Sequence, residues 1–405
     1  MTEVRSAPAL IAAGLLALAI AVGEVDGDRW FDTDHGDHLG LLFVVALLST
    51  AAYVVASMSG PRVRMRRVSP GWWGVGLLGW LGVAALFSPE PVVAVVVALG
   101  LAAMAAAAAR LVVLGGWVLL AWTVLAAFVV FAGASLTVDG LDLRVDGRLQ
   151  LLSLDANQLG RFSSLVVLAG VVLASQRSWT ERVIGAGAFV VGLLATVDSS
   201  SRTALAALGV ALVLVAWQRF DRVLVVVATV VGVLCLALVS PAALEDGATA
   251  MLGRDVATED VGSLAGRTEA WQAAADVAVD HPLVGLGPGY DDEAFLAARI
   301  DGTVGWEARN AHSLAGHLVV VGGVPALLLA LGALGAYLAA ALRRPLPLVD
   351  SFVLFLVIDG VSEAMIAQPN SAVAALAGAA AVRSLWVVAP PAWSPTARNP
   401  LVEVR

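Results

Sequence analysis

Apolar runs of about 15 to 25 residues fill most of the sequence and are separated by short polar turns, a pattern typical of a polytopic membrane protein. The sixth to eighth runs are near the shortest length that crosses a bilayer, so we expect these helices to be tilted, broken or longer than drawn. The pattern predicts an all-α integral membrane protein with about twelve transmembrane helices. The predicted spans are residues 8–23, 39–59, 72–87, 91–109, 112–133, 163–176, 183–197, 203–217, 223–240, 312–341, 348–366 and 371–388.

The longest polar interruption, residues 241–311, separates the ninth predicted span from the tenth. We expect it to form a large extracytoplasmic loop. Residues 1–240 then carry spans one to nine, and residues 312–388 carry spans ten to twelve. Residues 389–405 form a cytoplasmic tail whose prolines predict disorder.

Within the large loop, the sequence R-T-E-A-W-Q-A-A-A-D-V-A-V-D (Arg267–Asp280) has helical spacing. It predicts an amphipathic helix at the outer membrane surface. Pro282 follows the helix, and the glycines at positions 285, 287 and 289 predict a turn after it. The apolar face is expected to hold Trp271, Ala274, Val277 and Ala278.

Composition adds three points to this picture. Hydrophobic side chains make up 60% of the chain, which excludes an ordinary soluble globular protein. All 24 basic residues are arginine, a bias that favours a GC-rich bacterial source. The single cysteine, Cys235, excludes internal disulfides and cysteine-based metal sites.

The arginines also predict an orientation. With the N-terminus inside, 15 of the 24 fall in short cytoplasmic loops and tails, as the positive-inside rule requires. The acidic stretches Glu24–Asp37, Asp139–Asp155 and Glu245–Glu307 then all lie outside. We therefore expect a multi-pass protein of the bacterial cytoplasmic membrane, with its active site on the extracytoplasmic side.

Two arginines are candidates for binding an anion. Arg202, in D-S-S-S-R-T-A-L, lies at the outer end of one predicted span, just before the next. Its guanidinium either reaches the outer headgroups or grips a phosphate, and the hydroxyls from Ser199 to Ser201 are offered to the same site. Arg267 opens the predicted loop helix, so it is either a solvated surface arginine or faces one anion together with the helix N-terminus.

One histidine is a candidate general base. His312 stands at the start of the tenth predicted span, after Asn310. It either takes a proton from an attacking hydroxyl or makes a structural hydrogen bond at the membrane interface. His317 lies about 140° further around a helix, so the two histidines do not share a face and no metal site is expected there.

Other polar groups have simpler interpretations. Asp359 and Glu363 share a face of the eleventh predicted span and either relay protons or, as we favour, pair with an arginine. The glycines of G-L-G-P-G (Gly285–Gly289) lack the lysine and preceding strand of a phosphate-binding loop and predict a turn. The histidines and aspartates of D-T-D-H-G-D-H, which include Asp34 and His38, favour an acidic loop over a metal site. The tryptophans of Val68–Gly82, including Trp80, are typical of an interfacial aromatic belt.

Four motifs occur in a recognisable order. S-S-R-T-A-L precedes a span, G-R-T-E-A-W and H-P-L-V-G-L-G-P-G-Y lie in the loop, and A-H-S-L runs into a long apolar segment. This arrangement, over residues Thr196 to Leu342, resembles the O-antigen ligase and polymerase family, whose members are polytopic with about twelve spans and one large late loop. The first half of the chain matches by hydropathy alone.

The resemblance implies a metal-independent, inverting transfer of a glycan from an undecaprenyl diphosphate carrier to an acceptor hydroxyl, with no cofactor. By this resemblance Arg202 and Arg267 hold the diphosphate and His312 is the general base. The chain departs from the family where Ser313 replaces the asparagine of A-H-N, and where Val321 stands in place of a glutamate before Gly322 and Gly323. The second change removes a carboxylate from the acceptor site, so the resemblance does not identify the acceptor.

The partners implied are the lipid-linked glycan donor, a glycan or lipid-glycan acceptor and membrane lipids, without nucleic acid. Further candidates for substrate contacts are Ser201, Tyr290, Arg309 and Asn310. The alternative is a transporter or flippase for a lipid-linked or anionic substrate, a class that tends to have two related halves and helices broken at the midplane. Here the charged candidate residues lie on one side of the membrane, and most of the polar residues lie in the one large loop late in the chain. This pattern favours the enzyme.

Overall fold

In the computed structural model, the described residues are 7–23, 35–58, 72–138, 144–145, 148–149, 156–199, 201–219, 267–290, 295, 298–300, 302, 311, 313–343 and 345–361. At some helix ends, including those at Arg202 and Arg267, the backbone alone is described. The predicted spans at 223–240 and 371–388, the tail at 389–405 and most of the large loop lie outside these residues. The count of twelve spans therefore stays a prediction.

The described chain is almost wholly helical. Its helices are α1 (Ala7–Gly23), α3 (His35–Met58), α4 (Trp72–Leu86), α5 (Pro91–Val138), α6 (Ala156–Ala174), α7 (Trp179–Asp198), α8 (Arg202–Arg219), α12 (Arg267–Asp280), α14 (Leu314–Arg343) and α15 (Pro347–Gly360). Five of them, α3, α5, α6, α7 and α14, are long and apolar enough to cross a membrane, and α1, α4 and α8 are shorter apolar helices. The protein is an integral membrane protein with many helices.

Three details differ from the expectations drawn from the sequence. The runs at 91–109 and 112–133 correspond to the two helical segments of α5, which meet at Gly116, where φ is 66° and ψ is −170°, a few residues beyond the predicted gap. Helix α6 begins at Ala156, well before residue 163, so Arg161 lies within a helix and not in a loop. Strands β1 (Arg144–Val145) and β2 (Arg148–Leu149) pair antiparallel, and the Asp-Gly between them was an overlooked hairpin signal.

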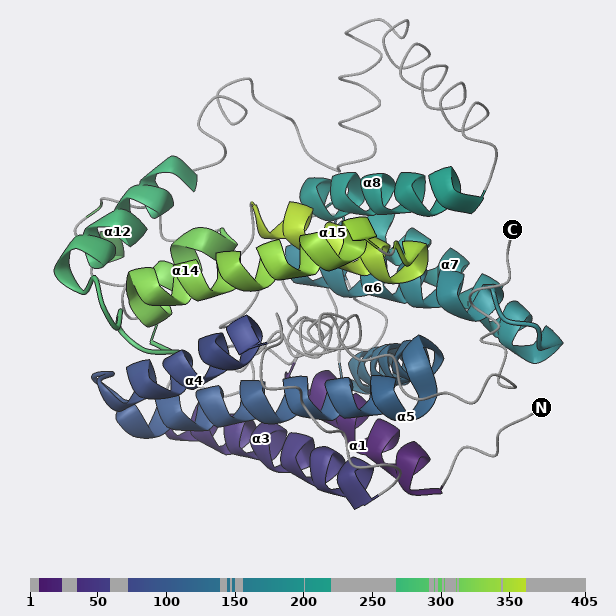
Figure 1. Ribbon diagram of the computed structural model, residues 1–405, viewed down its shortest axis with the longest axis horizontal. Helices are drawn as coiled ribbons and strands as arrows, with labels where there is room; N and C mark the ends of the chain where they lie inside the picture. Colours follow the sequence, from purple (N-terminus) through teal and green to yellow (C-terminus); the bar gives the residue numbers. More distant parts are fainter. Residues whose placement is uncertain are drawn as a thin grey trace, which may run out of the picture.

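The helices form two layers (Figure 1). Helices α1, α3, α4 and α5 lie on one side, and α6, α7, α8, α14 and α15 lie on the other. The main apolar cluster joins the two sides through α5, with Phe128 and Phe131 edge-on to Phe162 of α6. Helices α6 and α7 approach through glycines: a Cβ at Gly185 would lie 2.3 Å from the backbone nitrogen of Ala174. Such small residues allow close helix contact where lipid offers no hydrophobic drive.

Helix α12 packs against α14 at one end of the molecule (Figure 1). Its bounds are those expected from the sequence, but the expected face was partly wrong. Ala270, Ala273 and Ala274 are buried, whereas Trp271 is 37% exposed. Alanine has no side chain beyond Cβ, so the alanine face brings the α12 backbone close to Gly316 of α14.

Helix α14 is broken at Gly323, where φ is 68° and ψ is −173°, a conformation that is essentially restricted to glycine. We call residues 314–322 the outer arm and residues 324–343 the inner arm. Pro325 also lacks a backbone N–H, so several backbone groups near the break have no partner within the helix.

The turn after α12 fills this break. Leu286 N–H donates to Val320 O at 2.7 Å, and Val324 N–H donates to Pro282 O at 2.9 Å. The approach is backbone against backbone, because a Cβ at Gly285 would lie 2.3 Å from Val320 O. The expected turn at Gly285–Gly289 is confirmed, with positive φ at all three glycines. We call residues 282–289 the plug, because their backbone fills the break in α14.

Replacing Gly323 by alanine tests this backbone contact. The added Cβ would lie 2.3 Å from Leu283 O, and the left-handed φ alone costs about 1–3 kcal/mol. We expect Gly323→Ala to lower the melting temperature in detergent sharply or to prevent folding. Gly335→Ala is the matched control, since nothing lies within 4 Å of its Cβ in the same helix. Equal melting temperatures for both variants would contradict the described break.

Candidate functional site

The turn that leads into Arg202 rests on the start of α6. A Cβ at Gly160 would lie 2.5 Å from Ser201 Cβ and 2.7 Å from Ser199 Oγ. Ser201 is 1% exposed, its carbonyl accepts from Leu205 N–H at 3.0 Å, and its Oγ has no hydrogen-bond partner among the described groups. Arg202 itself begins α8, so its backbone position is fixed by this turn.

Seven buried polar residues lie on α6, on α15 and between Thr196 and Ser201, and we call them the α6–α8 polar cluster. Ser164 Oγ donates to Gly160 O at 2.8 Å and lies 3.4 Å from Thr196 Oγ1. Ser199 Oγ donates to Thr196 O at 2.7 Å, which ties the end of α7 to the turn. The cluster consists of Arg161, Ser163, Ser164, Thr196, Ser199, Ser201 and Asp359, none more than 3% exposed.

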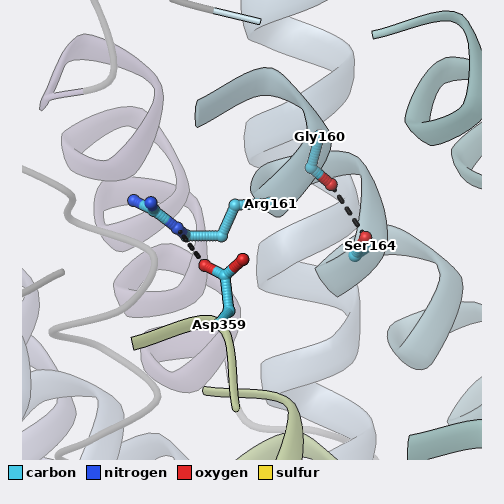
Figure 2. Close-up of polar contacts among 4 residues, drawn as sticks. All are labelled: Gly160, Arg161, Ser164 and Asp359. Atoms are coloured by element: carbon cyan, nitrogen blue, oxygen red, sulfur yellow. Dashed lines mark hydrogen bonds and ion pairs between the residues drawn. The ribbon is translucent and has the colours of Figure 1, made fainter. Parts of the chain in front are cut away.

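An ion pair holds the cluster to α15. Arg161 Nε donates to Asp359 Oδ2 at 2.7 Å, with side-chain exposures of 3% and 1% (Figure 2). The favoured interpretation of Asp359 as the partner of an arginine is confirmed; Glu363 lies outside the described residues. Buried charges are tolerated only when they are paired, so the bridge fixes α15 against α6.

The second arginine also begins a helix. Arg267 is the first residue of α12, as the sequence predicted, and neither its side chain nor that of Arg202 is described. In the view of Figure 1, α8 begins at its end nearer α12, and α12 begins at its end nearer α8. Both helix N-termini carry partial positive charge, which adds to that of the two guanidinium groups.

The chain on both sides of His312 is anchored beside α12, although His312 itself is outside the described residues. Ala311 is fully buried in the apolar cluster that contains Ala270 and Ala274 of α12. On the other side, Ser313 Oγ accepts from Gly316 N–H at 2.9 Å and so caps the N-terminus of α14. Asparagine and serine are both strong N-caps, which explains why serine can stand in the A-H-N motif.

The remaining predicted residues divide between described and undescribed positions. Tyr290 is half-buried after Gly289, whose Cβ would lie 3.1 Å from Val97 near the start of α5. Arg309 and Asn310 lie outside the described residues. Val321, which replaces the family's glutamate, is fully buried in the apolar cluster with α12. His317 is fully buried within α14, away from any exposed surface.

The family model described as O-antigen ligase matches residues 187–331. The chain carries an O-antigen ligase domain. This domain runs from α7 into α14 and includes both arginines, His312, the plug and the break. The match confirms the resemblance seen in the motifs and supports, at a coarse level, an enzyme of the glycosyltransferase type. No curated protein matches the chain.

Two contributors to the O-antigen ligase domain were missed in the sequence. Trp80 of α4 was assigned to an interfacial belt, yet its Nε1–H donates to Gly322 O at 2.7 Å, across 242 residues of sequence. The capping role of Ser313 was also missed, although a serine directly before an apolar helical run is a known start signal. The Gly-Gly-Val-Pro sequence at 322–325 was the local sign of a broken helix.

The Arg161–Asp359 bridge predicts strong coupling between its partners. We expect Asp359→Leu alone to destabilise the protein by about 3–5 kcal/mol, because it leaves a buried guanidinium without its carboxylate. The double variant Arg161→Met with Asp359→Leu should recover most of this loss. Unfolding of the two single variants and the double variant in detergent measures the coupling; strictly additive losses would contradict it.

The cap at Ser313 predicts a different response to two substitutions. Ser313→Ala should lose about 1 kcal/mol of stability, because Gly316 N–H loses its acceptor. Ser313→Asn should keep wild-type stability, since asparagine caps equally well. Thermal unfolding in detergent distinguishes the two variants, and a destabilised Ser313→Asn would argue against a capping role.

Proposed function

We propose that the protein is an O-antigen ligase-like glycosyltransferase that moves a glycan from undecaprenyl diphosphate to an acceptor hydroxyl on the outer face of the bacterial cytoplasmic membrane. The observation that carries the proposal is the O-antigen ligase domain at residues 187–331, which contains the whole set of candidate residues. It acts either as a polysaccharide polymerase or as a ligase, depending on the acceptor.

In this proposal Arg202 and Arg267 hold the diphosphate. Negative charge on the leaving diphosphate grows as the bond to the anomeric carbon breaks, and preorganised cationic groups lower the energy of that state. The arrangement of the backbone supports this role, because each arginine is the first residue of a helix. The turn before Arg202 is held by the α6–α8 polar cluster, so the guanidinium starts from a rigid base.

His312 is the proposed general base. It takes the proton of the acceptor hydroxyl while the hydroxyl oxygen attacks the anomeric carbon and undecaprenyl diphosphate departs from the opposite face. This single displacement inverts the anomeric configuration. The burial of Ala311 and the cap at Ser313 support the role, because they restrain the chain on both sides of the histidine.

The remaining candidates are assigned to substrate contacts. Ser201 offers a buried hydroxyl beside Arg202, and Tyr290 lies at the end of the plug. Arg309 and Asn310 directly precede the proposed base in sequence. Val321 supplies no carboxylate, so the acceptor hydroxyl relies on His312 for its activation.

Transfer by the purified protein tests the proposal. In nanodiscs with a chelator present, wild-type protein should release undecaprenyl diphosphate from a synthetic lipid-linked oligosaccharide. His312→Ala should lower kcat by at least about 10²-fold with donor binding kept, as for loss of a general base. Arg202→Ala and Arg267→Ala should weaken donor binding. Donor binding without release across a panel of acceptors would instead identify a carrier-lipid transporter.

A further inference from the structure

The direction of the outer arm of α14 is not set by the helix itself. At Gly323 the backbone leaves the helical conformation, so the outer and inner arms do not form one continuous rod. The angle between them is therefore fixed by contacts from elsewhere in the chain. In sequence, His312 directly precedes the cap of the outer arm.

Two of these contacts come from the plug and one from a side chain. The plug gives the bonds from Leu286 to Val320 and from Val324 to Pro282. The third bond is from the indole N–H of Trp80 to Gly322 O, at the last residue of the outer arm. A hydrogen bond to a buried backbone carbonyl is costly to break, so the indole N–H restrains that end of the arm.

Trp80 lies outside residues 187–331, in a helix that the family match does not include. Helix α4 nevertheless packs along α14, where Leu77 and Leu81 join Leu318 and Val321 in one buried cluster. The first half of the chain thus reaches the second half at the break of α14. A side chain there can act on the site without touching substrate.

We propose that Trp80 is a positioning residue: its indole N–H fixes the outer arm of α14 and so holds His312 in place for proton transfer. The mechanistic part rests on the function proposed above. Trp80 acts on catalysis through α14 alone, so donor binding at Arg202 does not depend on it. The arm-fixing part is a statement about the fold and can be tested without activity.

Two changes at position 80 remove the N–H. Trp80→Phe keeps an aromatic ring. Incorporation of 3-benzothienyl-alanine keeps the bicyclic shape as well, so it remains informative if Trp80→Phe does not fold. The matched control is Trp73→Phe on the same helix: Trp73 packs on the inner arm, where a Cβ at Gly332 would lie 2.5 Å from its ring.

We expect both changes at position 80 to lower kcat about tenfold while KM for the donor stays unchanged, the loss that one hydrogen bond to a buried carbonyl supports. Hydrogen exchange in nanodiscs should become about tenfold faster at the amides of Leu286 and Val324. Trp73→Phe should change neither quantity.

Exchange rates and kcat that match those of Trp73→Phe would overturn the proposal, as would a raised KM with unchanged kcat. If the wild-type protein shows no transfer at all, the proposed function falls. The exchange comparison then decides by itself whether Trp80 restrains the outer arm.

Discussion

Backbone groups buried away from water must find partners, and the break in α14 is the place where this requirement shapes most of the molecule. A continuous helix satisfies its own carbonyls and amides, but Gly323 interrupts the ladder within an apolar helix. Bonds from the plug and from the indole of Trp80 reach the backbone on both sides of the break. Gly285 of the H-P-L-V-G-L-G motif follows from the same requirement, since an added Cβ would lie 2.3 Å from Val320 O.

Broken helices in membrane proteins often expose backbone groups that bind ions or substrates, as in transporters. In this protein the plug and Trp80 occupy groups at the break, and the result is a bent support for the residues before α14. The outer arm is packed on α4 and α12 and begins at the cap formed by Ser313. The break therefore sets the direction of this arm, which agrees with the proposed role of His312, the residue directly before the cap, as a base.

The second constraint is buried charge. Arg161 and Asp359 come from α6 and α15, and their pairing makes both tolerable at 3% and 1% exposure. The bridge joins α15 to α6, and the turn of Ser199 and Ser201 packs on α6 at Gly160. Polar groups that would be costly one by one thus form a rigid base for the proposed diphosphate site.

Much of the fold was readable from the sequence because hydropathy is a local property. The spans that became α1, α3, α4, α7 and α8 were placed within a few residues, and α12 within none. Local turn chemistry likewise predicted the glycine turn at 285–289. The start of α6 was missed because Arg161 made a helical stretch appear polar, and its neutralising partner lies 198 residues away.

In the candidate site, too, local features could be predicted from the sequence and contacts between distant residues could not. The sequence by itself determined a membrane protein, its family and the identity of Arg202, Arg267 and His312 as candidates, because motifs and apolar runs are written in consecutive residues. Only the tertiary structure decided that Asp359 pairs with Arg161 and that Trp80 closes the break of α14. Those contacts join residues about 200 or more positions apart, and a hydrogen bond or ion pair between distant helices leaves no periodic pattern in either segment.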